Sequence, residues 1–373
     1  MTDRPRVAIA HDYLTQRGGA ERVVLAMARA FPDAPIYTTL YDPDGTYPEF
    51  RDRTIVTSSL NRVGLFRRDH RAALPLLAPA SSRLRVDADV VVASSSGWAH
   101  GFATSGKKLV YCHAPARWIY QSETYLGGPL TASPQGWALF GLRAPLRRWD
   151  RQAAASADVY LANSRVVAER IQEAYALEAR VVPPPHGVDT AGPLEPVPSV
   201  ASWAADGYAL VVSRLLPYKN VDVAVEALDR RKERLLVIGD GPMYDELAAR
   251  SSELLRVERG LSDAQMRWAY RHARVLVATS HEDFGLTPLE ASAFGVPTVA
   301  LHAGGYLDTI SPGLNGIFFS APDPVAIAAA LDEAVQIAWD SAAIQAHADR
   351  FAEPRFHDEM QREVKKLIGA PRE

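Results

Sequence analysis

The sequence contains a single cysteine, Cys112, among its 373 residues. One cysteine cannot form a disulfide within the chain, and no group of Cys and His has the spacing of a zinc site. No apolar run approaches the ~18 residues that a membrane-spanning helix needs, and the first residues lack the apolar core of a signal peptide. These absences predict a protein of the reducing cytoplasm that does not cross a membrane.

Neither sign of charge dominates, since the formal net charge is −3 at pH 7. The distribution is uneven, however: residues 1–190 hold 23 Lys and Arg against 18 Asp and Glu, whereas residues 191–373 hold 18 against 26. Arg62, Arg67, Arg68 and Arg71 border an apolar stretch in NRVGLFRRDHRAALPLLAPA. Such a face fits contact with anionic lipid or with a phosphate-bearing acceptor, but an ordinary solvated surface explains it equally well.

Short apolar runs alternate with longer segments of helical period, a pattern typical of β-α-β units around parallel sheets. We predict strands at 6–10, 54–58, 89–94, 108–112, 158–163 and 179–183, and at 209–213, 234–239, 254–259, 274–279, 297–301 and 316–319. Residues 183–207 are rich in Pro, Gly and Ala without a period and are interpreted as a linker. The sequence therefore predicts two doubly wound α/β domains with a ligand crevice at the carboxyl ends of their strands.

The stretch HEDFGLTPLEASAFGVPT, residues 281–298, holds two glutamates, Glu282 and Glu290. A helix rises ~1.5 Å and turns ~100° per residue, so eight helical steps would place the two carboxylates ~12 Å apart on different faces. They therefore cannot hold one metal ion or one substrate atom.

A short helix is predicted after the loop of this stretch. Thr287 is expected at the N-cap and Pro288 at the first helical position. The T-x-x-E spacing also fits a capping box, in which Glu290 reaches back to the backbone of the N-cap. The backbone N–H groups of residues 285–287 would form a seat for phosphate.

Further candidates follow the first two predicted strands of the second half. Arg214 and Lys219 lie within one tight loop in ALVVSRLLPYKN, where they could clamp an anionic diphosphate. Gly239 and Gly241 in VIGDGPMYDEL permit close approach of a ligand to the backbone. Because residue 244 is Tyr, the longer G-x-G-x-x-G fingerprint is absent, which argues against a nicotinamide enzyme.

The first half offers comparable positions. Gly18 and Gly19 lie between strand RVAIA and a helix, where backbone amides could approach phosphate or form only a flexible turn. His113 directly follows an apolar strand, as His11 and Asp12 follow the first strand. A histidine at the carboxyl end of a strand is either a site residue or a hydrogen-bonded core or turn residue.

Together these motifs resemble glycosyltransferase family 4, the retaining nucleotide-sugar transferases of the GT-B fold. The resemblance covers nearly the whole chain and rests on GGAERV, ANSRVVAERI, SRLLPYKN, GDGP and EDFGLTPLEA followed by GVPTVA and HAGG. YCHAPARWIY and LRRWDRQAAASADVYLANSR resemble a bacterial branch that includes mannosyltransferases acting on lipid-linked saccharides. Two positions depart from the pattern: Asp283 stands where the family often has Gly, and Asp308 where it usually has Glu.

The resemblance implies an α/β GT-B fold of two Rossmann-like, doubly wound parallel-sheet domains that face each other across a cleft. Residues 1–190 would bind the acceptor and residues 191–355 the nucleotide sugar. The terminal helix, residues 356–373, carries Phe356, Met360, Val364 and Leu367 on one face and would cross back to the first domain.

The resemblance also implies roles for the motif residues. Glu282 would face hydroxyls of the donor sugar, Glu290 would accept hydrogen bonds from the ribose, and Arg214 and Lys219 would neutralise the diphosphate. His113 would lie beside the transferred sugar. The remaining donor contacts would be Gly18, Gly19, Gly239, Gly241, Arg259, Gly260, Asp283, Phe284, Gly285, Leu286 and Thr287, with the nucleobase near Arg259 and Gly260.

The implied enzyme is a hexosyltransferase that retains the anomeric configuration, with the leaving diphosphate accepting the proton of the acceptor. Fixed donors aimed at the developing phosphate charge would be the main source of rate. No D-x-D-like motif follows a suitable strand, so neither a metal nor another cofactor is expected. A nucleotide-sugar epimerase of the same fold, a dehydrogenase and a non-catalytic binding module are the rival interpretations.

The expected donor is GDP-mannose, and the expected acceptor is a lipid-linked saccharide in cell-surface polysaccharide or glycolipid synthesis. A UDP-hexose enzyme acting on a soluble natural product is the alternative. The expected location is cytoplasmic, with peripheral contact between the basic first domain and the anionic inner face of the membrane. Nucleic acid is not an expected partner.

Overall fold

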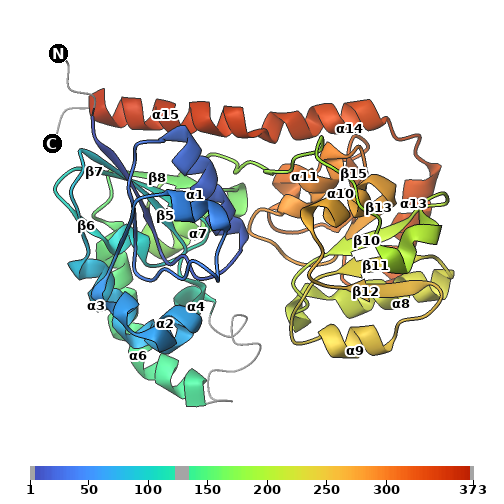
Figure 1. The fold of residues 1–373 in the computed structure, drawn as a ribbon, viewed down its shortest axis with the longest axis horizontal. Coiled ribbons are helices and arrows are strands. Elements are labelled where there is room, and N and C mark those ends of the chain that lie inside the picture. The colour runs from blue at the N-terminus through green and yellow to red at the C-terminus, as the bar shows by residue number, and fades with distance from the viewer. Residues whose placement is uncertain (1–4, 122–133, 370–373) are drawn as a thin grey trace. The chain divides into compact units, whose positions relative to one another are not determined.

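The computed structural model describes residues 5–121 and 134–369, with the side chains of residues 134–139 left out. The chain forms two compact units, one of Met1–Pro185 with Glu353–Glu373 and the other of His186–Ala352 (Figure 1). Among the described residues, no helix combines the length and the apolar character that crossing a bilayer requires.

The first unit is built on a parallel sheet. Its strands are β1 (Val7–His11), β2 (Ile36–Thr38), β3 (Ile55–Thr57), β5 (Val90–Ser95), β7 (Lys107–Cys112), β8 (Val159–Ala162) and β9 (Arg180–Val181), in the order β3-β2-β1-β5-β7-β8-β9. Two further strands, β4 (Arg85–Val86) and β6 (Ala103–Thr104), pair in parallel as a small separate sheet.

Helices cover both faces of this sheet. Helices α1 (Gly19–Ala30) and α15 (Glu353–Gly369) pack on one face, and α6 (Pro134–Ala154) and α7 (Arg165–Tyr175) contribute to the other. Shorter elements complete the unit: α2 (Gly64–Arg68), α3 (Leu74–Arg83), α4 (Arg117–Tyr120) and the 3-10 helices η1 (Pro48–Asp52), η2 (Ser59–Arg62), η3 (His70–Ala73) and η4 (Ala99–Gly101).

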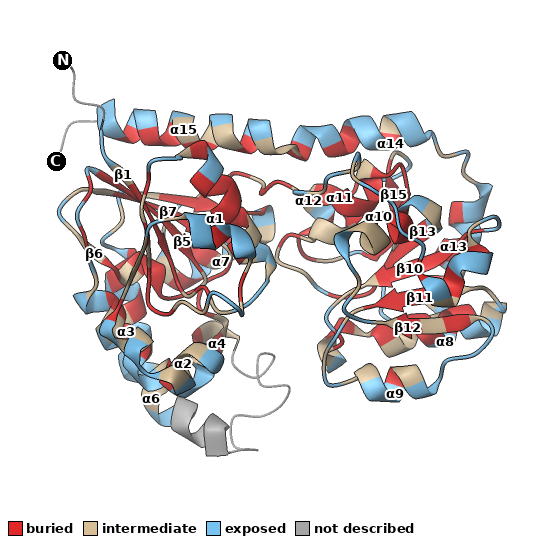
Figure 2. Ribbon diagram, viewed as in Figure 1, coloured by how far each residue is buried: buried red, intermediate tan, exposed pale blue. Residues whose placement is uncertain are grey.

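Burial on both faces explains why the strands read as unbroken apolar runs. Val90 and Val92 of β5 point into the cluster under α1 and α15, whereas Val91 and Ala93 point into the opposite cluster. Successive side chains of a strand alternate between faces, so a sheet covered on both sides needs apolar residues at every position. Strand β5 is accordingly buried at every position (Figure 2).

The terminal helix α15 belongs to the first unit. Phe356, Met360, Val364 and Leu367 recur at the three- and four-residue spacing of one helical face, and all four are buried in the core with residues of β1, β5 and β7. Arg29 of α1 forms an ion pair with Glu353. This helix therefore closes one face of the first sheet although it is the last element in the sequence.

The second unit also has a parallel sheet, with strands β10 (Tyr208–Val212), β11 (Leu235–Ile238), β12 (Leu255–Glu258), β13 (Ala273–Ala278), β14 (Thr298–Leu301) and β15 (Gly316–Phe319) in the order β12-β11-β10-β13-β14-β15. Helices α8 (Val221–Arg231), α9 (Tyr244–Ala249) and α13 (Pro324–Gln336) cover one face, and α10 (Asp263–His272) and α11 (Leu286–Ala293) the other. The remaining elements are α12 (Tyr306–Thr309), α14 (Ser341–Ala348), η6 (Pro198–Trp203), η7 (Pro217–Lys219) and η8 (Asp349–Phe351).

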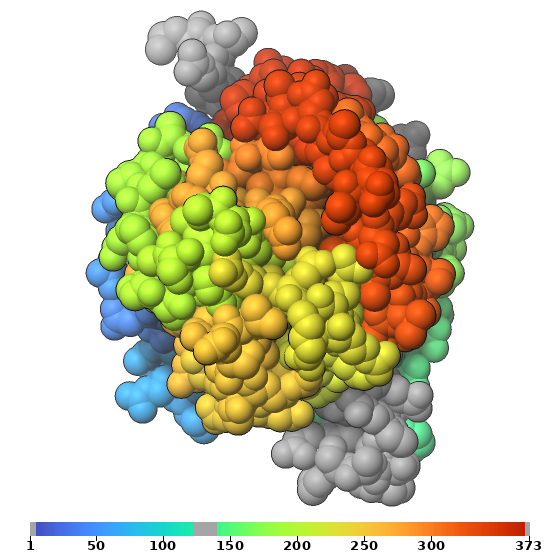
Figure 3. Space-filling model, turned by 90° about the vertical axis from the view of Figure 1, so that its right-hand side faces the viewer, coloured from blue at the N-terminus to red at the C-terminus, as the bar shows by residue number. Residues whose placement is uncertain are grey.

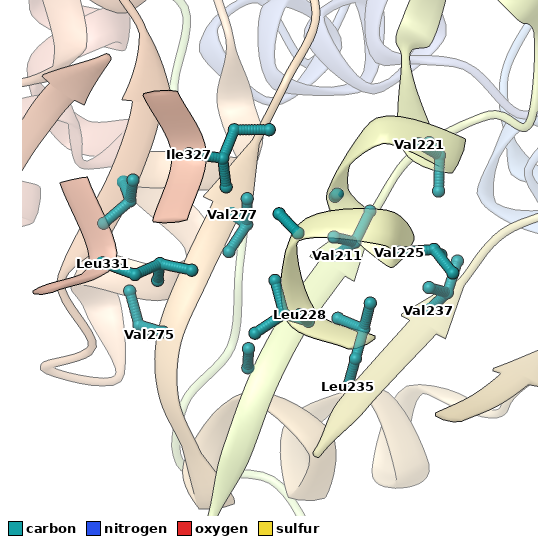
Figure 4. Close-up of a cluster of buried hydrophobic side chains, with 14 of the residues drawn as sticks. Val211, Val221, Val225, Leu228, Leu235, Val237, Val275, Val277, Ile327 and Leu331 are labelled. Carbon is teal, nitrogen blue, oxygen red and sulfur yellow. The ribbon is translucent and has the colours of Figure 1, made fainter. Parts of the chain in front are cut away.

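Aliphatic side chains form the core of the second unit. Val211 and Val237 of the sheet face Val225 and Leu228 of α8, and Leu331 of α13 packs in the same cluster (Figure 4). Residues of α13 and α14, in red-orange, lie at the surface of this unit (Figure 3). The doubly wound α/β fold predicted from the sequence is confirmed in each unit.

The observed organisation differs from the sequence analysis in three details. Residues 183–207 are not a bare linker, because they include η6 and bury Val197, Val200 and Trp203 in the core of the second unit. Strand β2 was not predicted from the sequence. The strand is short, it follows a proline in APIYTT, and it is buried because it pairs with β1 and β3. The units divide after Pro185 and Ala352, where the sequence analysis placed boundaries after 190 and 355.

Candidate functional site

The strand order of the second unit reverses between β10 and β13. β11 and β12 lie on one side of β10, and β13 to β15 lie on the other. In open α/β sheets, ligands bind beyond the carboxyl ends of the strands at such a switch point. The loops that leave β10 and β13 carry Lys219 and Glu282, and the fold brings these two predicted site residues into contact.

Lys219 and Glu282 form an ion pair in which Nζ donates to Oε1. The Lys219 side chain is 5% exposed and that of Glu282 is 25% exposed. Ser280 Oγ donates to the same carboxylate oxygen at 2.5 Å, and Nζ lies 5.0 Å from the centre of the Tyr218 ring. Because a buried ammonium is costly to desolvate, the carboxylate is what keeps this charge tolerable. The pair presents a cation suited to phosphate beside an acceptor suited to hydroxyl groups.

Local backbone geometry holds the loops of this pair together. Asn220, directly after Lys219, has a φ of 53°, a left-handed conformation that Asn tolerates better than most residues. Its Nδ2 donates to Thr279 O at 3.2 Å, and Thr279 Oγ1 donates to Lys219 O at 2.7 Å. The sequence PYKN therefore ends the loop after β10 against the end of β13.

Gly304 and Gly305 of HAGG pack against the backbone of the loop that carries Glu282. A Cβ on Gly304 would overlap Glu282 O, and a Cβ on Gly305 would overlap the backbone of Phe284. Gly305 N donates to Glu282 O at 2.8 Å. Phe284 itself is buried with Leu289 and Phe351, so its side chain anchors the loop in the unit's interior.

The start of helix α11 differs from the expectation. Its N-cap is Gly285 at φ +86°, and Thr287 is the second helical residue, so Thr287 is not the N-cap and Pro288 is not the first helical position. A side chain at Gly285 would meet the Tyr306 ring at 2.5 Å, which is why the chain turns here with a glycine. The capping-box interpretation is also wrong, because a glycine N-cap has no side chain to take part.

Glu290 lies on α11 and is buried. Its Oε2 accepts a hydrogen bond from Tyr270 OH at 2.6 Å. Tyr270 comes from α10, and its ring stacks on Phe294 with centres 5.6 Å apart. The structure therefore fixes one oxygen of Glu290 by a neighbouring helix, and the ribose role stays a prediction.

The glycines after β11 contact the chain itself. A Cβ on Gly239 would overlap Ser213 O, and a Cβ on Gly241, which has φ +152°, would lie 2.5 Å from Leu215 O. Both glycines therefore allow the loop after β11 to pack on the loop that carries Arg214. Arg214 is exposed, and its NH2 donates to Tyr218 OH at 3.4 Å.

Arg259 and Gly260 follow β12, beyond the glycine loop. The Arg259 guanidinium lies 3.9 Å from the centre of the Tyr244 ring and 3.4 Å from Asp240 Oδ1. Gly260 has φ +68° and open space around the position of a Cβ. The nucleobase role of these two residues stays a prediction.

The first unit has a switch point of the same kind, between β1 and β5. His11 ends β1, and its Nδ1 lies 3.0 Å from Ser94 Oγ and 3.1 Å from Ser94 O at the end of β5. Ser94 Oγ lies 2.8 Å from Nε2 of the predicted site residue His113, which follows β7. Burial and then the charge of His11 lower the pKa of His113 to about 3, so this ring is neutral at pH 7.

Helix α1 brings a buried carboxylate to the same place. Glu21 Oε1 lies 3.9 Å from His11 Nε2, and Gln16 Nε2 donates to it at 3.0 Å. Burial lowers the pKa of His11, but the hydrogen bond and charge of Glu21 outweigh it, so the net shift is upward. Gly18 is the N-cap of α1, and a Cβ there would meet Glu21 Oε2 at 2.5 Å. The Gly-Gly turn is therefore shaped around this carboxylate.

Asp12 has an anchoring position beside His11. Its carboxylate accepts hydrogen bonds from the backbone N–H groups of Ser96, Trp98 and Ala99 at 2.6, 3.0 and 2.6 Å. These bonds tie the end of β1 to the loop after β5 and satisfy donors at the start of η4. The Asp12 carboxylate therefore holds the loop after β5 in place through hydrogen bonds to its backbone.

Sequence reasoning did not identify Glu21, Ser94 and Tyr270. Glu21 lies within GGAERV, but a glutamate in the first helical turn is ordinarily an exposed group near the helix dipole. Ser94 reads as the polar end of an apolar strand, and Tyr270 gives no signal in the sequence. Their partners come from other elements, so only the fold places them at the site residues.

Among residues 5–121 and 134–369, no group of three or more His, Cys, Asp or Glu side chains is arranged to hold a metal ion. The expectation that no metal is required stays a prediction.

Two family models match this chain. Residues 17–191 match the family described as Glycosyltransferase Family 4, and residues 202–349 match Glycosyl transferases group 1. A family 4 glycosyltransferase match thus lies in the first half of the chain, and a group 1 glycosyltransferase match lies in the second. The first match includes His113 and the Gly18-Gly19 turn, and the second includes Lys219 and Glu282.

Three curated relatives illustrate the family. A D-inositol 3-phosphate glycosyltransferase of Xylanimonas cellulosilytica is 32% identical over 48% of this chain and 48% of its own. The GDP-mannose-dependent alpha-(1-6)-phosphatidylinositol monomannoside mannosyltransferase of Mycolicibacterium smegmatis is 29% identical over 53% and 57%. The human alpha-1,3/1,6-mannosyltransferase ALG2 is 25% identical over 98% and 97%. The chain spans about half the length of the first curated relatives that it matches.

Solved structures share the fold. The structure of Anabaena Alr3699/HepE in complex with UDP-glucose has a TM-score of 0.70 at 18% identity and covers 97% of this chain and 100% of its own. At this identity the likeness concerns the fold alone, and it confirms the predicted GT-B class of two Rossmann-like units.

Proposed function

We propose that this protein transfers a hexose from a nucleotide sugar to an acceptor hydroxyl with retention of configuration. The observation that carries the proposal is the buried Lys219 ammonium at the switch point of the second sheet, held by Glu282. A ligand with both phosphate and hydroxyl groups suits such a pair, because phosphate can take over the ammonium while hydroxyls donate to the carboxylate.

Lys219 and Arg214 stabilise the departing diphosphate in this proposal. When the glycosidic bond breaks, negative charge grows on the β-phosphate oxygen, and a fixed ammonium beside it stabilises the transition state more than the ground state. Arg214, with its exposed fork of N–H donors, closes on the phosphate oxygens. The N–H groups at the start of α11, around Gly285, Leu286 and Thr287, add the positive end of a helix dipole.

Glu282 and Glu290 orient the donor. Glu282 has a second oxygen besides the one that Lys219 and Ser280 share, and a carboxylate of this kind accepts hydrogen bonds from sugar hydroxyls. Glu290, fixed by Tyr270, accepts from the ribose. No carboxylate acts as nucleophile: the acceptor oxygen attacks the face that the diphosphate leaves, and the diphosphate takes its proton.

GDP-mannose is the proposed donor. Support comes from the two mannosyltransferases among the relatives, one of which is named as GDP-mannose-dependent. The second candidate, a UDP-hexose donor with a soluble acceptor, draws support from the Anabaena protein, which was crystallised with UDP-glucose. A nucleotide-sugar epimerase of the same fold remains the third, less supported candidate.

The proposed acceptor is a lipid-linked saccharide used in cell-surface polysaccharide or glycolipid synthesis, met by the first unit at the cytoplasmic face of the membrane. Elements η2 to α3 expose Val63, Leu65 and Leu76 close in sequence to exposed Arg62, Arg68 and Arg71. Apolar side chains interleaved with arginines suit the boundary between anionic headgroups and acyl chains. No metal ion is proposed for the reaction.

Two measurements test the proposal. Thermal unfolding with GDP, UDP, ADP and dTDP identifies the base, since a ligand at 100 times its Kd adds ~2.7 kcal/mol of stability. Incubation with labelled GDP-mannose and a polyprenyl-diphosphate saccharide, followed by NMR of the product, reports transfer and anomeric configuration. A larger thermal shift with UDP than with GDP would move the donor assignment to the second candidate. Release of an epimerised nucleotide sugar without transfer would overturn the proposed reaction.

A further inference from the structure

Ser94 links two histidines at the switch point of the first unit. The side chain is fully buried, and its Oγ lies 3.0 Å from His11 Nδ1 and 2.8 Å from His113 Nε2. A hydroxyl has one proton and two acceptor lone pairs, so it can donate to at most one of these two nitrogens and can accept from the other. The direction in which that proton points decides which nitrogen of His113 is protonated.

The backbone carbonyl of Ser94 settles the direction. His11 Nδ1 lies 3.1 Å from Ser94 O, and a carbonyl oxygen can only accept. His11 Nδ1 therefore carries a proton, which it shares between the carbonyl and Ser94 Oγ. The hydroxyl proton of Ser94 is then free to be donated to His113 Nε2, and in that arrangement Nε2 is the acceptor and the ring proton is on Nδ1.

Glu21 fixes the charge of His11. With Nδ1 protonated, the other ring nitrogen, Nε2, faces Glu21 Oε1 at 3.9 Å. His11 faces Glu21 from α1, Asp12 from its own strand and His113 from β7, so both charged neighbours are anionic and the third group is neutral. Protonation of Nε2 as well makes His11 an imidazolium between two carboxylates. That cation in turn opposes any protonation of His113.

We propose that Glu21, His11 and Ser94 are positioning residues that hold His113 neutral with its proton on Nδ1, so that the ring serves transfer as a hydrogen-bond donor and not as a base. The part of this inference that concerns transfer rests on the proposed function. Asn163 Nδ2 donates to His113 O at 3.1 Å and fixes the backbone of the same residue, and within the part of the chain that the structure describes no hydrogen bond engages Nδ1. Nδ1–H is then the hydrogen-bond donor that the ring offers to a ligand.

The arrangement explains the fully buried glutamate in GGAERV. Burying a carboxylate is unfavourable unless it is paired, and here Oε2 has no hydrogen-bond partner among the described residues. The Glu21 carboxylate offsets this unfavourable burial because it pairs with the His11 cation, which orients the ring of His113. The adjacent glycine Gly18 keeps the space that Oε2 occupies free of a side chain.

The direct test is the tautomer of His113 in the full chain. Long-range 1H–15N correlation on histidine-labelled protein distinguishes protonated from unprotonated ring nitrogens, and the His113→Gln variant assigns the signals. At pH 6 we expect Nδ1 of His113 protonated and Nε2 unprotonated, while both nitrogens of His11 carry protons. A protonated Nε2 on His113 in the unmodified protein, or a neutral His11 at pH 6, overturns the proposal, whether or not any donor is transferred.

Ser94→Ala tests the link to the reaction. Removing the hydroxyl frees Nε2, so the Nδ1–H form of His113 loses its preference and kcat falls by about tenfold, the effect of one hydrogen bond, with KM for the donor changed much less. Ser81→Ala is the matched control: Ser81 is also fully buried in the first unit, but its Oγ has no hydrogen-bond partner among the described residues. Equal kcat values for the two variants would remove Ser94 from the mechanism.

Glu21→Gln adds a pH profile that a purely structural role would not produce. Without the carboxylate, His11 loses its proton at lower pH, and the charge that lowers the pKa of His113 is then missing. His113 of the variant therefore takes up a second proton at higher pH than in the unmodified protein, so the decline of kcat on acidification begins at higher pH. A variant with reduced but pH-independent kcat contradicts the proposal. If no nucleotide sugar supports transfer, the proposed function fails and the NMR result still decides the tautomer.

Discussion

Replacement of Lys219 by methionine removes the buried ammonium at the second switch point while keeping most of the side-chain volume. The lysine side chain is 5% exposed, so a methionine in its place would contact the same apolar surroundings, including the Tyr218 ring. The Lys219→Met variant loses the cation that is buried in η7, in the loop that leaves β10. Under the proposed mechanism this cation stabilises the leaving diphosphate.

The expected loss follows from how fixed donors act on a developing charge. Removing one preorganised donor costs about 10²–10³ in kcat, or ~2.7–4 kcal/mol of transition-state stabilisation. Because Glu282 is 25% exposed, water can solvate its carboxylate once the ammonium is gone, so folding loses only ~1 kcal/mol. The loss of rate should therefore greatly exceed the loss of stability.

The reverse substitution gives an asymmetric result. Glu282→Gln leaves the Lys219 ammonium buried without its anionic partner, and an uncompensated buried charge costs ~3 kcal/mol or more. Glu282→Gln should thus lower the free energy of unfolding more than Lys219→Met does, although both remove the same ion pair. Urea titrations of the two variants measure this difference.

Initial rates with labelled nucleotide sugar at saturating concentration are the assay for kcat. Lys232→Met is the matched control, because Lys232 lies in the same unit, is 72% exposed and pairs with Asp229 across one helical turn. We expect kcat of the control within about twofold of the unmodified enzyme. The reasoning is refuted if Lys219→Met turns over donor within about threefold of the unmodified enzyme, or if Glu282→Gln is the more stable of the two variants.

Three further predictions concern stability. Gly239→Ala forces a Cβ onto Ser213 O and should lower the free energy of unfolding by ~3 kcal/mol in urea titration. Gly141→Ala is the control, because a Cβ there meets open space in α6, and it should leave the stability unchanged or raise it. Equal effects of the two substitutions would contradict the packing described for the loop after β11. Burial lowers the pKa of Lys108 from 10.5 to about 8, so the unfolded chain binds this proton more tightly than the folded protein does. Between pH 8 and 10.5 the free energy of unfolding of the unmodified protein, measured relative to Lys108→Met, should therefore rise by up to ~3 kcal/mol. A difference between the two proteins that stays constant over that range would contradict the lowered pKa. Met360→Ala in α15 should cost ~2–5 kcal/mol and Ile368→Ala, exposed on the same helix, under ~0.5 kcal/mol; if the two costs are alike, α15 does not complete the core of the first unit.

Much of the fold follows from local sequence signals. Ser262 and Gln265 form a capping box at the start of α10, and Asp323 caps α13 ahead of Pro324, as their residue types predict. The strands were predictable because burial on both faces leaves continuous apolar runs such as DVVVAS. Strand β2 escaped prediction because its three residues are stabilised by neighbours in the sheet and not by their own pattern.

The candidate site was predictable as residue types and spacing. Lys219 in PYKN and Glu282 in HEDFG follow apolar strands of the second sheet, and His113 in YCH follows an apolar strand of the first. Such positions lie at the carboxyl edge of their own parallel sheet. The start of α11 was misjudged because Thr and Pro are common cap and first-turn residues, whereas the turn is governed by the Tyr306 ring against Gly285. A contact from a residue much farther along the chain overrode the local preference.

The sequence by itself determined two α/β units, the strands that build them and the loops that carry phosphate-binding and sugar-binding residue types. These properties depend on neighbours along the chain: periodicity, caps and turns. The tertiary structure alone decided which residues meet. Strand order brought Lys219 to Glu282 and His11 to Ser94, and helix packing brought Tyr270 to Glu290 and α15 to the first sheet. Each of these pairs is distant in sequence, and its charge, tautomer or burial depends on a partner that no local pattern encodes.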